Sequence, residues 1–173
     1  MGQLPTNTLS FQHSKRFAGF STYNFLSFVT GLDKVGSFGL TWIRQGIEDI
    51  PIYPALEGTP AERMANVAFQ PKAEPDGYLQ DVENAWFLSK NYVFKDHVFL
   101  ADNLPFRVAL GGNLKYISQR LGSARATGFG LDVGVLLASE KLALGDVTFG
   151  LMVQDVFTTT LKWNTGHEGM ART

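Results

Sequence analysis

The sequence predicts an all-β fold, an antiparallel meander of about seven strands that forms part of a transmembrane β-barrel, with one long loop that carries a short helix. Apolar and polar residues alternate with period two over most of the chain, as in strands with two different faces. The alternating segments follow one another at hairpin spacing without helices between them, whereas a parallel sheet would need helical crossovers. We therefore expect a single domain over residues 1–173.

Seven segments carry this alternation. The segment 106–119 has a polar face with Asn113 and Lys115, and its other face is apolar. The segment 126–138 has an apolar face, and its second face is nearly all glycine, with Gly128, Gly130 and Gly134 beside Asp132. In order, the predicted strands are 8–17, 21–31, 35–48, 83–95, 106–119, 126–138 and 147–163.

A proline-rich stretch at 51–80 interrupts the pattern and is predicted to be a long loop. Within it, Thr59 can cap a helix, Pro60 suits the first helical position and Glu62 completes a capping box. These signals predict a short helix at about 60–68. A loop of this length is either functional or a surface decoration, and the sequence supports both interpretations.

Composition narrows the classes of function. The net charge is -1 and the chain contains no cysteine. The balanced charge provides no basic field for nucleic acid, so no nucleic-acid partner is expected. The lack of cysteine excludes a disulfide framework, a thiolate metal site and a cysteine nucleophile. The three histidines, His13, His97 and His167, do not have the spacing of metal ligands. We expect no enzyme activity, no catalytic residue, no metal and no cofactor.

The low charge of the strands favours a membrane barrel over a soluble sandwich. A soluble sandwich normally fills its outer face with charged and hydroxyl side chains, but the segments from 106 onward contain few charges. Lipid would contact the apolar face, where a Lys or Arg at mid-depth costs about 2–4 kcal/mol. The polar face would then line the lumen. Its polar candidates, expected to form interior hydrogen bonds and ion pairs rather than to select solutes, are Arg107, Asn113, Lys115, Asp132 and Gln154.

Three aromatic residues lie late in odd-numbered predicted strands, which run in the same direction in a meander. Trp42, Tyr116 and Trp163 would therefore lie near one level, as in an aromatic girdle. The alternative is that they are ordinary core aromatics of a soluble β-barrel.

Several segments also resemble one known family. They are FQHS at 11–14, GLTWIR at 39–44, GNLKYI at 112–117, ATGFGLDVG at 126–134, and QDV at 154–156 followed by TLKWNTG at 160–166. Together they resemble strands of the PorV/PorQ family, over most of the chain but without an invariant signature.

The resemblance implies a FadL-like barrel of about fourteen strands in the outer membrane of Gram-negative bacteria. Some family members act in type IX protein secretion, and FadL relatives pass hydrophobic molecules; no catalytic residues are implied. The implied partners are outer-membrane lipid, together with secretion-system proteins or a hydrophobic ligand.

The chain departs from the family pattern in three ways. Its N-terminus has no signal peptide, its predicted strand number is odd, and it ends without an aromatic-ended strand. We therefore expect a truncated N-terminal portion of an outer-membrane protein. Two alternatives remain: a channel for hydrophobic small molecules, which predicts an apolar pocket inside the barrel, and a soluble β-barrel binding module, which predicts folding without detergent.

Overall fold

The computed structural model describes residues 7–32, 36–69, 74–94, 98–100, 104–142 and 145–170. Within these residues ten strands form one antiparallel sheet in the order β1-β2-β3-β4-β6-β7-β9-β10, with β5 paired to β6 and β8 paired to β7. The predicted all-β antiparallel meander is therefore confirmed. The strands are β1 (Asn7–Arg16), β2 (Ser21–Leu32), β3 (Gly36–Ile52), β4 (Gly77–Val93), β5 (Val98–Leu100), β6 (Leu104–Leu121), β7 (Ala124–Leu142), β8 (Gly145–Val153), β9 (Thr160–Trp163) and β10 (Glu168–Met170).

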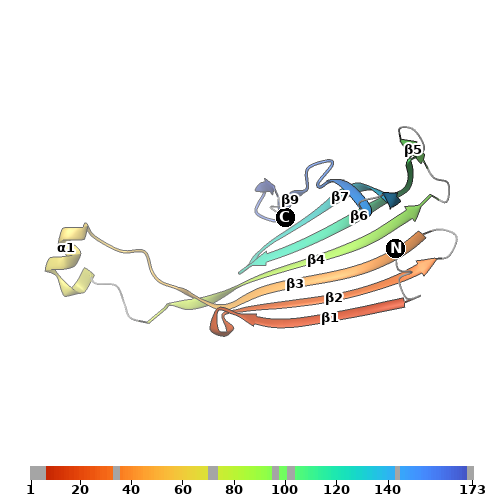
Figure 1. The fold of residues 1–173 in the computed structure, drawn as a ribbon. Helices are drawn as coiled ribbons and strands as arrows, with labels where there is room; N and C mark the ends of the chain where they lie inside the picture. The colour runs from red at the N-terminus through yellow and green to blue at the C-terminus, as the bar shows by residue number, and fades with distance from the viewer. Residues whose placement is uncertain are drawn as a thin grey trace.

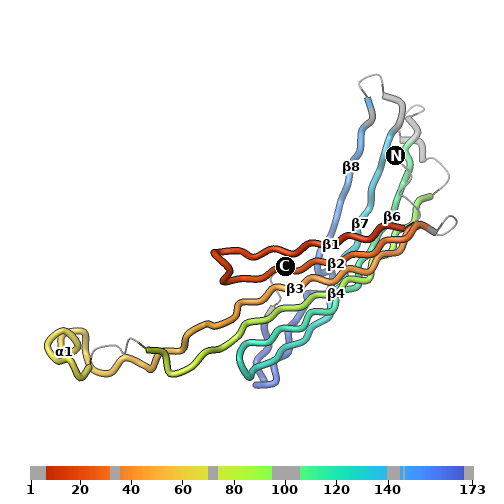
Figure 2. Tube along the Cα trace, turned by 90° about the horizontal axis from the view of Figure 1, so that it is seen from below, coloured from red at the N-terminus to blue at the C-terminus, as the bar shows by residue number. Residues whose placement is uncertain are grey.

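The sheet is curved and open (Figure 1). Figure 2 shows that β6, β7 and β8 turn steeply away from the layer formed by β1 to β4. Within the described residues β1 pairs only with β2, and β8 pairs only with β7, so each of these outer strands keeps one free edge. Closure into a barrel would require further strands at these edges, and the barrel itself stays a prediction.

The strands β3 and β4 continue beyond their neighbours as a two-stranded ribbon, which leads to a projecting arm (Figure 1). Both strands are longer than the sequence predicted, so the predicted loop at 51–80 is reduced to residues 53–76. The extension follows a register shift between Ile47 and Ile50. Within the shift Asp49 adopts a left-handed backbone with φ of 58°, a conformation that aspartate tolerates better than most residues.

The arm carries the predicted helix, α1 (Pro60–Ala65), followed by a 3₁₀ turn at Val67–Phe69. The predicted capping box is present: the Glu62 N–H donates to Thr59 Oγ1 at 3.3 Å, and the Thr59 N–H donates to Glu62 Oε2 at 2.7 Å. Hydrogen bonds from Thr59, first from its backbone and then from its side chain, lower the pKa of the Glu62 carboxyl. Neither helical turn has a buried residue, so capping rather than packing stabilises the arm.

The predicted strand 147–163 is wrong in one respect, because it is two strands, β8 and β9, separated by residues 154–159. We call residues 154–159 the inward bulge. The pairs Val133–Val153 and Thr127–Lys162 are six residues apart along β7 but nine residues apart along the segment from β8 to β9. The three extra residues are accommodated within the inward bulge. Since three is odd, the side chains of β9 exchange faces relative to those of β8.

Most buried side chains among the described residues lie on one face of the sheet, and Ser139, which pairs with Phe106 and Val147, is buried on the other. We call the face that carries Lys115 and Asp132 the inner face and the opposite one the outer face. Lys115 is only 2% exposed and has the largest fully buried side chain among the described residues. The buried apolar residues there are few: Ala126, Ala138 and Leu161. The sheet therefore lacks the packed second layer that a soluble sandwich would place against its apolar face.

Candidate functional site

The outer face is organised in rows that cross the sheet along the strand pairings. One row, here called the aromatic row, contains five aromatic side chains and one leucine: Phe11, Leu26, Trp42, Trp86, Tyr116 and Phe129. The next row toward the arm, here called the polar row, contains only polar side chains: His13, Asn24, Arg44, Asn84, Ser118 and Thr127. Six consecutive long strands thus change from apolar to polar at one level.

On the other side of the aromatic row, an apolar band continues along the strands. Its next row contains Leu9, Phe28, Leu40, Leu88, Leu114 and Leu131. On β7 the band runs from Phe129 to Leu137, which is about 26 Å along the strand at the usual rise per residue. Strand tilt would shorten its height, so it approaches the apolar belt of about 25 Å on outer-membrane barrels.

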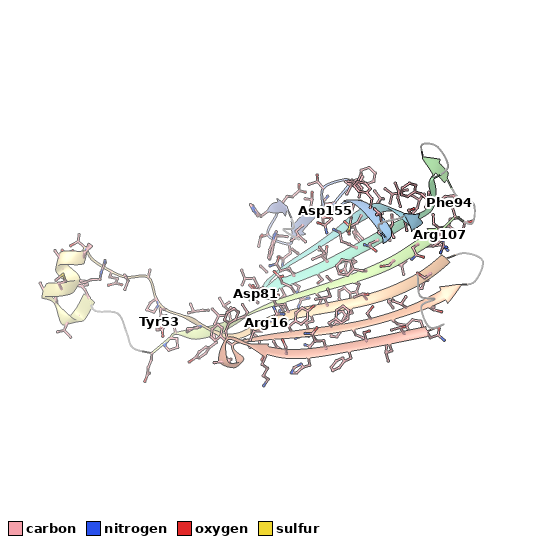
Figure 3. The ribbon with its side chains drawn as sticks, in the orientation of Figure 1. Arg16, Tyr53, Asp81, Phe94, Arg107 and Asp155 are labelled. Carbon is pink, nitrogen blue, oxygen red and sulfur yellow. The ribbon has the colours of Figure 1, made fainter. Side chains whose placement is uncertain are left out.

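Most residues of this band are exposed, although they are apolar, and Leu131, Val135 and Leu137 are half-buried. Phe129 is 68% exposed, Leu114 is 52% exposed and Leu40 is 49% exposed. Figure 3 shows side chains projecting from the sheet with no second layer of the chain against them. One charge enters the band at Lys90 on β4, whose long stem can carry its ammonium toward a polar boundary. An apolar surface of this extent is rare on soluble proteins and marks contact with a partner or with lipid.

The aromatic row has the geometry of a boundary between apolar and polar surroundings. The Trp86 and Tyr116 rings lie 5.5 Å apart, and the Tyr116 and Phe129 rings lie 5.0 Å apart. The Trp42 indole N–H donates to Asn84 Oδ1 of the polar row at 3.2 Å. Each indole or phenol can thus keep its ring in the band and its polar end toward the polar row.

Of the three girdle residues predicted from sequence, the structure places two together. Trp42 and Tyr116 belong to the aromatic row. Trp163 instead pairs with Ala126, three residues from Phe129 on β7, and therefore lies on the inner face. The inward bulge causes this exchange of faces. Sequence reasoning missed the bulge because the run of threonines at 158–160 has a strand-like composition.

The inner face carries a buried ionic cluster. Lys115 Nζ lies 2.8 Å from Asp132 Oδ1 and 2.6 Å from Asp155 Oδ1. The Asp155 N–H donates to Asp132 Oδ1 at 2.9 Å, and the Thr159 hydroxyl donates to the Asp155 carboxylate. Asp132 is 4% exposed and Thr159 is 2% exposed. The cluster fixes the inward bulge, on which Asp155 lies next to β7 (Figure 3), against the inner face.

The glycines of β7 make room for this bulge. A Cβ at Gly130 would collide with the Thr159 hydroxyl and would lie 2.9 Å from Lys115 Cε. A Cβ at Gly128 would lie 2.7 Å from the Thr160 carbonyl oxygen. The alternating glycines that the sequence displayed within a strand therefore serve close packing across the inner face.

The predicted lumen-facing residues divide into three groups. Lys115 and Asp132 form the ion pair that interior pairing predicted. Asn113 and Arg107 lie on the same inner face, opposite Asp132 and Ala138, and Arg107 is near the end of β6 away from the arm (Figure 3). Gln154 is exposed just after β8 ends.

Sequence reasoning missed Asp155 and Thr159 as members of the cluster. One signal could have been read: Asp155 stands at a position where the alternation of β8 would place an apolar residue. A charge at that position indicates that the strand has changed its phase.

The described residues contain no group of three or more potential metal-ligating side chains, and His97 lies outside them. No helix in the described ranges is both long and apolar enough to cross a membrane. Comparison with models of protein families, with curated proteins and with solved structures found no match to this chain.

Proposed function

We propose that this chain forms part of the wall of an outer-membrane β-barrel of the PorV/PorQ type, acting in transport or as a scaffold for protein secretion. The observation that carries the proposal is the alignment of the aromatic row, the polar row and the apolar band across six strands. In lipid, the exposed band would be solvated by hydrocarbon, and the aromatic row would lie at the headgroup level.

Energetics support lipid over water as the surroundings of the outer face. Burial of one large aliphatic or aromatic side chain is worth roughly 1.5–3 kcal/mol. A band of this size in water would forgo many such contributions, whereas a soluble domain normally covers its apolar face with a second layer. The alternative of a soluble β-barrel binding module would require the chain to fold with this apolar band in contact with water.

The inner face supports a polar interior. A lysine that is 2% exposed would be very unfavourable without its two carboxylate partners, and the sequence supplies both on the same face. Among the described residues the outer face has no buried ion pair, and its Lys162–Glu168 pair is exposed, so the two faces of the sheet differ as the wall of a barrel requires. The free edges of β1 and β8 would then pair with further strands, because unpaired backbone groups in lipid cost several kcal/mol each.

The arm supports the scaffold function. It lies beyond the polar row, outside the apolar band, and its apolar side chains are exposed: Tyr53, Leu56, Met64 and Val67. Figure 3 places Tyr53 at the base of the arm. In outer-membrane barrels the longer loops are extracellular, so the arm would contact partner proteins outside the cell.

Tryptophan quenching by brominated lipids tests the membrane proposal. Three variants, each retaining one of Trp42, Trp86 and Trp163, are reconstituted in vesicles with bromine placed at defined acyl-chain depths. We expect strong quenching by shallow bromines for Trp42 and Trp86, and weaker quenching for Trp163 on the inner face. Equal and weak quenching of all three, or folding to the same sheet without detergent or lipid, would contradict the membrane proposal and favour a soluble module.

A channel for hydrophobic small molecules is a second candidate, and one inner-face row favours it. That row crosses the sheet with mostly apolar side chains: Gln12, Phe25, Ile43, Ala85 and Ile117. Binding of a fluorescent fatty acid by detergent-solubilised protein, lost in an Ile117→Asn variant and kept in a Ser118→Asn control on the outer face, would support the channel. Absence of fatty-acid binding would leave the scaffold.

A further inference from the structure

A hollow of about 300 Å³ opens on the inner face across β3, β4, β6 and β7. Its volume is at the lower end of the range for small-molecule sites in proteins. The polar inner-face side chains around it come from four strands: Ser37, Thr41, Ser89, Asn91, Asn113 and Asp132. Gly111 and Gly134 leave the space open where side chains would otherwise fill it.

The hollow presents hydrogen-bonding groups that the protein does not use itself. Among the described residues, no hydrogen bond engages the side chain of Ser89 or that of Asn113, and both are half-buried. The Ser37 N–H donates to Asn91 Oδ1 at 2.7 Å, which leaves the Asn91 amide N–H groups for another acceptor. A hydroxyl, two amide groups and a carboxylate therefore converge on one small volume.

The charge at the hollow disfavours anions. The adjoining cluster has one lysine and two aspartates, so its formal charge is +1 − 2 = −1. Asp132, which lines the hollow, already binds Lys115 and the Asp155 N–H. Lys90 also lines the hollow, but its register places its side chain on the outer face. Donors and acceptors without a free positive charge suit a ligand that has hydroxyl groups and no net charge.

We propose that this hollow is a subsite for a neutral, hydroxylated solute of about monosaccharide size. The proposal rests on the membrane function above and narrows its transport branch to hydrophilic solutes, since the inner face would then be the lumen. Asn113 and Ser89 bind solute hydroxyls, and the glycine backbone at Gly111 allows the sugar ring to approach the wall.

The test uses the full chain in dodecyl-dimethylamine-oxide micelles, which contain no sugar headgroup. Saturation-transfer NMR titrations compare glucose, glucuronate and glucosamine, which differ mainly in charge. We expect glucose to bind and glucuronate to bind at least about tenfold more weakly. Two outcomes would overturn the assignment. One is the lack of saturation transfer to glucose. The other is an affinity for glucosamine at least about tenfold higher than that for glucose, because it would identify a cation site.

Two variants and one control make the result specific. Asn113→Leu should weaken glucose binding about tenfold. Gly111→Ala should weaken glucose binding about fivefold by filling the hollow. The new Cβ would meet only the Lys90 carbonyl oxygen at 3.8 Å and Asn91 Cβ at 3.9 Å, so the fold tolerates the substitution. Asn24→Leu, the same change on the outer face, should leave binding unaltered. Glucose binding unaffected by both inner-face variants contradicts the proposal.

This experiment separates the two proposals. If the tryptophans are quenched by lipid but no sugar binds, the membrane proposal stands and the solute subsite is wrong. If sugar binds to protein that folds without detergent, the subsite stands and the membrane proposal is wrong.

Discussion

An arginine in place of Leu114 distinguishes lipid from water at the outer face. Leu114 lies within the apolar band, 52% exposed, four residues from Ser118 of the polar row on the same strand and face. If this face contacts lipid, Leu114→Arg places a guanidinium about 13 Å along the strand from the polar row. The expected loss in the free energy of unfolding is then about 2–4 kcal/mol. In water, the same substitution on an exposed position changes stability by about 0.5 kcal/mol at most.

The assay is reversible urea unfolding of the refolded chain in lipid vesicles, followed by tryptophan fluorescence. The matched control is Ser118→Arg, which adds the same side chain to the polar row and should cost no more than about 1 kcal/mol. The informative quantity is the difference between the two variants. A difference below about 1 kcal/mol would refute the inference that Leu114 faces hydrocarbon, because midplane and interface positions would then be equivalent.

Three further predictions concern the inner face and the arm. Lys115→Met should lower the free energy of unfolding by about 3–5 kcal/mol, because it leaves two carboxylates without their cation. The control Lys162→Met removes an exposed ion pair and should cost less than about 1 kcal/mol. Similar losses for the two variants in urea unfolding would contradict the buried cluster. Gly130→Ala should lower the free energy of unfolding by about 1–3 kcal/mol because its Cβ displaces the inward bulge, and Gly111→Ala should lower it much less. The same unfolding assay measures both variants. An unchanged stability of Gly130→Ala would mean that the bulge does not pack against Gly130. The pKa of Glu62 is lowered in the folded arm, so the ionised carboxyl stabilises the arm at neutral pH and this stabilisation is lost as the pH falls through its titration. Amide-exchange protection of α1 should decrease over the same pH range. A Glu62→Gln variant with the same pH dependence would show that Glu62 is not the cause.

The sequence was sufficient for the features that depend on local chemistry. Period-two alternation predicted every long strand, and the capping box predicted the residue at which α1 begins, Pro60. The ribbon of β3 and β4 extends further than the sequence predicts, because prolines such as Pro51 indicate the start of a loop. In the structure Pro51 pairs with Tyr78 after the register shift at Ile47, so the proline is tolerated beyond the body of the sheet.

The features that sequence reasoning missed depend on contacts between distant segments. Lys115 and Asp155 are separated by 40 residues, and no local pattern places them together. The pairing of Lys115 with Asp132 could be anticipated because both lie on one predicted face of neighbouring strands. The size of the inward bulge could not be anticipated, because its three extra residues are visible only after β8 and β9 are both aligned to β7.

The strength of the membrane proposal lies in the registers rather than in the composition. Each strand alone changes from apolar to polar at one position, such as Phe11 to His13 or Phe129 to Thr127, and this could occur anywhere along it. The pairings bring these changes to a single level across six strands. A sheet whose outer face meets only water has no physical reason to align them, since every level has the same surroundings. A bilayer imposes one boundary on all strands at once, and a shift of two residues in any one pairing would place a polar side chain among the aromatic rings.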